Sequence, residues 1–254
     1  MIRPTFRGLT IRRPVREYLS EEDLDDPGRS YMVFEHVERY RFGSGYVRGK
    51  SVLDAACGIG YGSRLLLDAG ASRVYGYDIS AEAIRTAQRK FKTEGLIFKR
   101  GDILDGLPEK CDVFCSFETI EHIEYPKLGR YFDAVLNSLD KDGVYIASTP
   151  NREVRQPQSE MTQRPLNPYH HFELSLAELT EHLDRYFDRV EVYGYMRKNM
   201  LHYMYRLADR MTSKALGIGT FARLAQRLGY YKVRPYASDI KYWNFIAVCQ
   251  HPKR

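Results

Sequence analysis

Acidic residues and closely spaced glycines follow the ends of three apolar segments in the first half of the chain. The first segment, 51–56, leads into three glycines at alternate positions: Gly58, Gly60 and Gly62. Such glycines let the backbone approach a ligand closely, and a helix that follows offers unpaired N–H groups. The second segment ends at Asp78, whose carboxylate can bind both hydroxyls of a ribose. The third ends at Asp102, which can accept a hydrogen bond from an adenine amino group. The set predicts a nucleoside-binding site.

A second chemical cluster, Glu118, Glu121 and His122, follows the apolar segment 111–117. α/β sheets place reacting groups at the carboxyl ends of their strands. If a helical turn begins there, the three side chains lie at i, i+3 and i+4 on one face. Carboxylate and imidazole groups could then bind a divalent metal, serve as acid and base, or pack behind the site.

A pair of histidines, His170 and His171, lies between a proline-rich loop and a later helix. Ser175 is the expected N-cap of that helix. An imidazole in such a loop can remove a hydroxyl proton, so both histidines are candidate bases, although ordinary loop positions fit them as well.

Strand and helix patterns alternate along the chain, as a parallel α/β sheet requires. A helix begins near Ser30, where apolar residues recur at helical spacing. Further helices are predicted at 62–69, 80–92, 126–139 and 175–186. Strands are predicted at 51–56, 73–78, 96–100, 111–117, 143–148, 189–195 and 241–249.

The acid before the glycine turn, Asp54, completes an ordered set of motifs that resembles the class I S-adenosylmethionine-dependent methyltransferases. The resemblance implies a Rossmann-like α/β fold with a seven-stranded, mostly parallel sheet and an antiparallel last strand. It also implies that helices cover both faces of the sheet and that a helical insertion precedes the last strand. The donor, S-adenosyl-L-methionine, would contact a set of residues along these strand ends: Arg39, Asp54, Ala56, Gly58, Gly60, Asp78, Ile79, Asp102, Ile103 and Phe117. Arg39 would hold the methionine carboxylate, for which a bidentate guanidinium is well suited.

The E-x-x-E-H run at Glu118, Glu121 and His122 resembles a signature of the ubiquinone-biosynthesis O-methyltransferases and of relatives that act on sugars and natural products. For the ubiquinone group it implies Mg²⁺ bound by these three residues. In other relatives the same run acts without metal. The resemblance also implies that the histidine region faces the acceptor, so His122, His170 and His171 are the candidate catalytic residues.

The composition fits one cytoplasmic α/β domain. The chain has 254 residues, of which 43% are apolar, and no run approaches the roughly 18 apolar positions of a membrane span. It also shows no hydrophobic signal core at its first residues. The four cysteines form no C-x-x-C pair, so buried reduced thiols are expected rather than disulfides or zinc ligands.

The predicted methyltransferase domain spans 30–254, with an arm before it and two distinctive segments inside it. Residues 1–29 form a basic N-terminal arm, and 150–174 form a proline-containing substrate loop. Residues 197–234 form a basic helical insertion or lid, whose positive charge could meet an anionic substrate, a membrane face or solvent. No recognisable nucleic-acid-binding module accompanies this charge.

These motifs predict transfer of a methyl group to a hydroxyl of a small molecule: a sugar, glycolipid or natural product, either phosphorylated, lipid-linked or neutral. An N-methyltransferase of RNA, protein or an amino sugar is the main alternative, but an N-P-P-Y or D-P-P-Y tetrad is missing. A dinucleotide-binding oxidoreductase is a second alternative, against which Ser63 stands where its third glycine is expected. A non-catalytic binding module is a third. The oligomeric state is left open.

Overall fold

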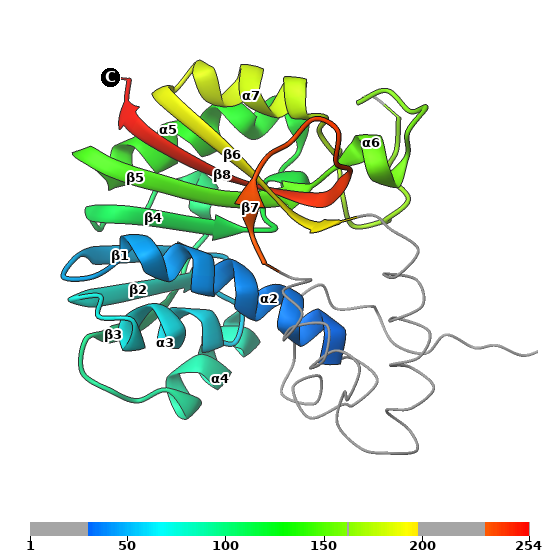
Figure 1. Cartoon of the computed structure of the whole chain (residues 1–254). Helices are drawn as coiled ribbons and strands as arrows, with labels where there is room; N and C mark the ends of the chain where they lie inside the picture. Colours follow the sequence, from blue (N-terminus) through cyan, green and yellow to red (C-terminus); the bar gives the residue numbers. More distant parts are fainter. Residues whose placement is uncertain (1–29, 162, 198–231, 254) are drawn as a thin grey trace, which may run out of the picture.

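The fold was analysed in a computed structural model that describes residues 30–161, 163–197 and 232–253 (Figure 1). The predicted arm, 1–29, and most of the predicted insertion, 197–234, lie outside these residues. The described chain forms one sheet in the order β3-β2-β1-β4-β5-β8-β6-β7. The strands are β1 Ser51–Ala55, β2 Arg73–Asp78, β3 Leu96–Arg100, β4 Cys111–Phe117, β5 Leu139–Pro150, β6 Phe187–Arg197, β7 Arg234–Pro235 and β8 Tyr242–Pro252.

Strands β1 to β5 pair in parallel, so their carboxyl ends meet at one edge of the sheet. Strand β8 is antiparallel to both of its neighbours, β5 and β6. The predicted mostly parallel Rossmann-like sheet with an antiparallel last strand is therefore confirmed. The two-residue strand β7 adds an eighth strand at the edge beside β6, which the sequence patterns did not predict.

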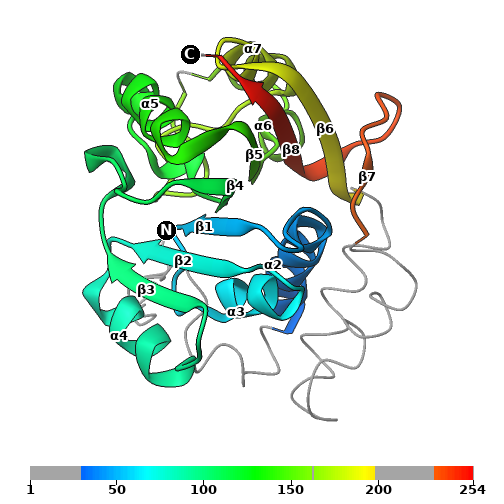
Figure 2. The same cartoon turned by 90° about the vertical axis from the view of Figure 1, so that its left-hand side faces the viewer.

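Helices cover both faces of the sheet (Figures 1 and 2). One apolar cluster joins the sheet to α2, α3 and α4, and a second joins its other face to α5 and α7. Successive residues of a central strand point to opposite faces and so belong to different clusters. In β1, Val52 belongs to the first cluster and Leu53 to the second. The helices are α2 Ser30–Gly43, α3 Tyr61–Asp68, α4 Ala81–Lys90, α5 Leu128–Ser138, α6 Arg152–Arg155 and α7 Leu176–Asp184.

Local capping explains where two of these helices begin. The Ser80 hydroxyl accepts a hydrogen bond from the Ala83 N–H at the start of α4. At α7, Ser175 and Glu178 form a reciprocal capping box, so the predicted N-cap is confirmed. The short helix α6 lies inside the predicted substrate loop, 150–174, which is thus partly structured.

The four cysteines are buried and unbridged, as predicted. Two of them, Cys57 and Cys115, belong to the apolar cluster beneath α2 and α3. Within the described ranges, no helix combines the length and apolar character needed to cross a bilayer.

Candidate active site

A cavity of about 480 Å³ opens at the carboxyl ends of β1, β2, β3 and β4. Because these strands are neighbours in the sheet, the turns that follow them converge on one space. Predicted site residues line the cavity from all four turns: Ala56, Gly58, Asp78, Ile79, Asp102, Ile103, Phe117, Glu118 and His122. The nucleoside-binding cluster and part of the catalytic cluster therefore face the same cavity.

The turn after β1 presents its backbone to the cavity in an unusual conformation. Ala56, Gly58 and Gly60 all have positive φ angles, of 58°, 55° and 83°. At Gly60 an added Cβ would lie 2.5 Å from the Phe98 ring, so a side chain there would displace the core beneath the turn. The predicted need for glycine in this turn thus has two causes, backbone conformation and packing.

Asp54 lies beneath the glycine turn and does not line the cavity. Its carboxylate accepts hydrogen bonds from the Tyr40 and Ser63 hydroxyls. Gly62 allows this arrangement, because an added Cβ would lie 2.0 Å from the Tyr40 ring. Burial raises the pKa of Asp54 to about 7, although the two hydroxyls partly offset the effect. In this structure Asp54 therefore joins β1 to α2 and α3 beneath the glycine turn.

Asp78 joins the end of β2 to the glycine turn. One oxygen accepts a hydrogen bond from the Gly58 N–H at 2.9 Å, and the other accepts one from the Ser80 N–H at 2.8 Å. Each oxygen retains a second lone pair, and burial raises the pKa of this carboxyl. Next to it, the apolar side chain of Ile79 is 63% exposed and lines the cavity.

Asp102 occupies the corresponding place at the end of β3. Its Oδ1 accepts a hydrogen bond from the Leu104 N–H and caps a short helical turn, Ile103–Asp105. Asp102 and Ile103 both line the cavity, as predicted.

Aromatic side chains from α2 and α3 form the wall beside the glycine turn. The Phe117 and Tyr40 rings meet edge to face at 4.8 Å, and Tyr61 packs edge-on against Tyr40. His36 Nδ1 lies 2.8 Å from the Tyr61 hydroxyl, and burial followed by the nearby Arg39 charge lowers the pKa of His36 to about 3. Sequence reasoning missed His36 and Tyr61. The i, i+4 spacing of His36 and Tyr40 on one helix was the available signal.

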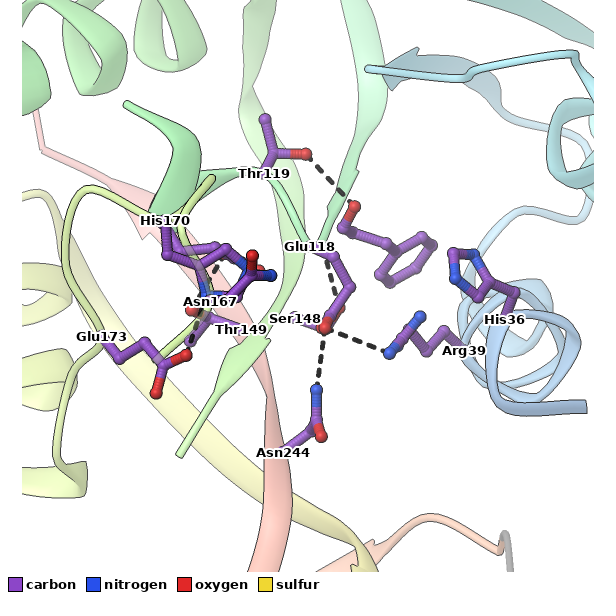
Figure 3. Close-up of polar contacts among 12 residues, drawn as sticks. His36, Arg39, Glu118, Thr119, Ser148, Thr149, Asn167, His170, Glu173 and Asn244 are labelled. Carbon is purple, nitrogen blue, oxygen red and sulfur yellow. Dashed lines mark hydrogen bonds and ion pairs between the residues drawn. The ribbon is translucent and has the colours of Figure 1, made fainter. Parts of the chain in front are cut away.

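Glu118 adopts a positive φ of 52° directly after β4 and reaches a polar cluster at the ends of β5 and β8 (Figure 3). The Ser148 hydroxyl donates to its Oε1, and the Asn244 amide donates to its Oε2, each at 2.8 Å. Arg39 Nη2 forms an ion pair with the same Oε2 at 3.1 Å. Burial would raise the pKa of Glu118, but Arg39 and the hydroxyl outweigh it, so the pKa is lowered and the group stays anionic.

Arg39 is 3% exposed and does not itself line the cavity, but it is paired with Glu118, which does. Its guanidinium lies over the Tyr195 ring, 5.3 Å from the centroid. Its Nε and Nη1 are buried without an acceptor in the part of the chain that the structure describes. Buried cationic donors without acceptors are costly, so this site is suited to one more anionic group.

The predicted metal trio does not form. The helical turn after β4 spans only Ile120–His122, so Glu118 precedes it and its carboxylate points toward Arg39. Glu121 is fully buried, and burial, followed by the Glu118 charge, raises its pKa far above the usual range. The residues that do come together are Glu121, His122 and His170, whose ligand atoms lie within 4.8 Å of one another. Two imidazoles and one carboxyl do not suit Mg²⁺, which prefers oxygen ligands.

His122 is the one of the three predicted catalytic histidines that lines the cavity. Its Nδ1 lies 3.1 Å from the Tyr169 carbonyl oxygen, which can only accept, so Nδ1 carries a proton. His170 is buried and packs edge-on against His122, with ring centroids 4.9 Å apart. His171 is exposed and meets this cluster only through its N–H, which donates to the Glu121 carbonyl.

Two residues that sequence reasoning missed hold His170. The Glu173 carboxylate accepts from its Nδ1 at 2.8 Å, and the Asn167 amide lies 2.8 Å from its Nε2 (Figure 3). Both lie within three residues of His170, so the i, i+3 spacing of a histidine and a glutamate was the available signal.

Residues 52–143 match the sequence profile of the family described as Methyltransferase domain. A "Probable S-adenosylmethionine-dependent methyltransferase" of Mycolicibacterium smegmatis is 34% identical over 138 residues, which cover 54% of this chain and 51% of the relative. A protein of Mycobacterium tuberculosis with the same description is 30% identical over 160 residues, 62% of this chain and 55% of the relative. The chain thus spans about half the length of the curated relatives it matches.

Solved structures show the same fold. An S-adenosylmethionine-dependent methyltransferase from Mesorhizobium loti superposes with a TM-score of 0.56 at 19% identity, over 85% of this chain and 97% of that one. The N-methyltransferase NodS of Bradyrhizobium japonicum, solved with S-adenosyl-L-homocysteine, gives 0.55 at 14% identity over 90% of each chain. With the strand order described above, the chain therefore has the Rossmann-like fold of these methyltransferases, and its residues 52–143 resemble a methyltransferase domain.

Proposed function

We propose that this chain transfers the methyl group of S-adenosylmethionine to a hydroxyl oxygen of a small molecule of the sugar, glycolipid or natural-product class. One observation carries the proposal. The glycine turn, Asp78 and Asp102 line the same cavity as His122, so a nucleoside site and an imidazole base share one space.

The residues around the cavity fit the donor. Ribose hydroxyls can use the remaining lone pairs of Asp78, and the adenine ring can cover the exposed Ile79 side chain. Asp102, with the backbone at Ile103, would contact the adenine edge, and the backbone near Ala56 and Phe117 would line the methionine portion. Arg39, the predicted partner of the donor carboxylate, is paired with Glu118 and does not line the cavity, so we assign it no direct contact with the donor.

When bound, S-adenosylmethionine supplies a methyl group on a sulfonium, which is already activated for displacement. The tasks left to the protein are alignment and proton removal. The glycine turn and Asp78 hold the donor. We assign His122, which lines the cavity, as the acceptor for the hydroxyl proton, and the contact of its Nδ1 with the Tyr169 carbonyl orients its ring. The buried His170–Glu173 pair packs behind His122 and keeps its ring in place.

The choice of a hydroxyl acceptor rests on this histidine arrangement and on the E-x-x-E-H run. A hydroxyl has to lose a proton as the methyl group arrives, and an imidazole that lines the cavity is a suitable acceptor. Since the predicted trio does not form a Mg²⁺ site, we derive no step from a metal.

The experiment combines binding and turnover. The protein is first titrated with S-adenosyl-L-homocysteine by calorimetry. It is then incubated with labelled S-adenosylmethionine and fractionated small-molecule extracts, with and without EDTA, and the product linkage is determined by NMR. We expect donor binding and chelator-resistant O-methylation. A methyl group on nitrogen would replace the proposed acceptor class, and failure to bind the thioether would overturn the proposal.

A further inference from the structure

Asp54 is a buried acid beneath the proposed donor site. It lies in β1, two residues before the cavity-lining Ala56, and its side chain has no exposure to solvent. Tyr40, which lines the cavity, places its hydroxyl 3.2 Å from one oxygen of the carboxyl and 3.4 Å from the other. The Ser63 hydroxyl donates to the second oxygen from α3. One layer of side chains and backbone therefore separates the carboxyl from the cavity.

The ionisable groups around Asp54 include no cation within the described part of the chain. They come from α2, α3, the glycine turn, β4 and β2, and they are Tyr40, Tyr61, Cys57, Cys115 and Asp78. Only two hydroxyls favour the ionised carboxyl, and burial outweighs them, so the pKa of Asp54 is raised to about 7. A cation placed nearby would favour ionisation.

The electrostatic influence of Asp54 extends to the cavity wall. Four of the five groups listed above line the cavity: Tyr40, Cys57, Tyr61 and Asp78. A ligand against these groups comes within range of the same charge. Because the carboxyl is buried, solvent ions screen that interaction less than they screen one at the surface.

The methyl donor and its product differ by one charge at the sulfur atom. S-adenosylmethionine carries a sulfonium, whereas S-adenosyl-L-homocysteine carries a neutral thioether. With the nucleoside at Asp78 and Asp102 and the methionine portion along the glycine turn, the sulfur would lie over the end of β1. An ionised Asp54 beneath that turn attracts the sulfonium and has no such effect on the thioether.

We propose that Asp54 is a specificity-determining residue that favours the charged donor over the neutral product without touching either ligand. Binding of the sulfonium favours the ionised carboxyl, so the Asp54 proton passes to solvent as the donor binds. After the methyl group has been transferred, the thioether no longer favours ionisation, and the carboxyl takes up a proton from solvent. The preference for donor over product therefore grows as the pH rises toward and past neutrality. The inference rests on the proposed function.

The test measures proton release by calorimetry, with no acceptor present. S-adenosylmethionine and S-adenosyl-L-homocysteine are each titrated into the protein at pH 6.5, in two buffers that differ in ionisation enthalpy. The difference in heat gives the number of protons released. Affinities for both ligands are then measured from pH 5.5 to pH 8.

Two variants isolate the contribution of Asp54. Asp54→Asn keeps the shape of the protonated carboxyl and removes its titration. Asp68→Asn is the matched control, at an exposed aspartate of α3 that is paired with Arg64. Asp78 and the α-amino group of the ligand can also titrate, but they are present in every sample, so each ligand is compared between proteins. Thermal unfolding checks that each variant retains its fold.

We expect the wild-type protein and Asp68→Asn to release about 0.3 to 0.5 proton more than Asp54→Asn when S-adenosylmethionine binds. With S-adenosyl-L-homocysteine the three proteins should not differ. From pH 5.5 to pH 8 the ratio of donor to product affinity should rise about 3- to 10-fold more in the wild-type protein than in Asp54→Asn.

Equal proton release by the wild-type protein and Asp54→Asn would overturn the proposal, as would affinity ratios that change equally with pH. If Asp54→Asn does not fold, Ser63→Ala takes its place. Loss of that hydroxyl disfavours the ionised carboxyl and should move the rise in the affinity ratio to higher pH, and an unmoved rise would overturn the proposal. If the wild-type protein binds neither ligand, the proposed function itself fails.

Discussion

The two halves of the cavity are built in different ways. The donor half consists of the glycine turn, Asp78 and Asp102, and its hydrogen bonds join residues close in sequence, such as Gly58 with Asp78, 20 positions apart, and Asp102 with Leu104. The acceptor half consists of 118–124 and 167–173. Its contacts join residues 47 and 126 positions apart, as in His122 to Tyr169 and Glu118 to Asn244. A site made from strand ends and backbone can be predicted from short sequence motifs. A site made from side chains of distant segments depends on how the whole chain folds.

The largest expected effect separates chemistry from donor binding in the acceptor half. His122→Gln should lower kcat by about 10²- to 10⁴-fold, because the proposed proton acceptor is lost. The affinity for S-adenosyl-L-homocysteine should stay within about twofold, since His122 is assigned no donor contact. His171→Gln, at the exposed neighbouring histidine, should leave kcat within about twofold. Equal rates for the two variants would contradict the assignment.

At Asp78, in the donor half, we expect a change in donor binding. Asp78→Ala removes the proposed ribose contacts and leaves the Gly58 and Ser80 N–H groups without their acceptor. We expect donor affinity to fall by about 100-fold or more, measured by calorimetry. The control is Asp105→Ala, a change at an exposed aspartate paired with Arg130. Donor affinity in Asp78→Ala close to that of the control would remove Asp78 from the donor half.

Packing beneath the donor half is tested at Gly62. Gly62→Ala places a methyl group 2.0 Å from the Tyr40 ring and should lower the free energy of unfolding by about 1–3 kcal/mol. Gly45→Ala, where an added Cβ meets nothing within 4 Å, should change it by less than about 0.5 kcal/mol. Urea unfolding measures both, and similar values would show that Tyr40 can move aside freely.

The last prediction is a pH dependence of stability that arises at Asp54. Its pKa is about 7 in the folded protein and 3.8 as the ordinary value, so the folded state holds a proton that the unfolded state releases. This contribution to stability is fully present below pH 3.8 and is lost as the pH rises toward 7, by at most about 1.4 kcal/mol per pH unit. Asp54→Asn should flatten the curve of unfolding free energy between pH 5 and 7. Parallel curves for the two proteins would show that Asp54 titrates normally.

The donor half could be predicted from sequence because its signals are local. A strand, a turn and an acid recur in a fixed order, and the structure places Ala56, Gly58, Asp78, Ile79, Asp102, Ile103 and Phe117 around one cavity. Asp54 was the exception. A residue of a buried strand points to one face or the other, and spacing alone did not show that its partners are Tyr40 and Ser63.

The acceptor half could be predicted only in part. The helical periodicity assumed for Glu118, Glu121 and His122 failed because Glu118 has a left-handed backbone and precedes the turn. The partners of these residues, including Ser148, Thr149 and Asn244, come from β5 and β8, and no short-range pattern connects them. The mostly parallel sheet could be predicted from the alternation of strands and helices, whereas the two-residue strand β7 is too short to leave a pattern in the sequence.

The central place of β8 has a consequence for how the protein is made. In the described chain, β6 pairs only with β8 and β7, and β8 alone joins it to the rest of the sheet. During synthesis, residues 187–197 of β6 emerge well before their partner strand. The edge of β6 that pairs with β8 therefore stays unpaired until residues 242–252 have been made. Strand β8 completes the sheet, so a chain that stops before residue 242 would leave the edges of β5 and β6 unpaired and exposed to aggregation.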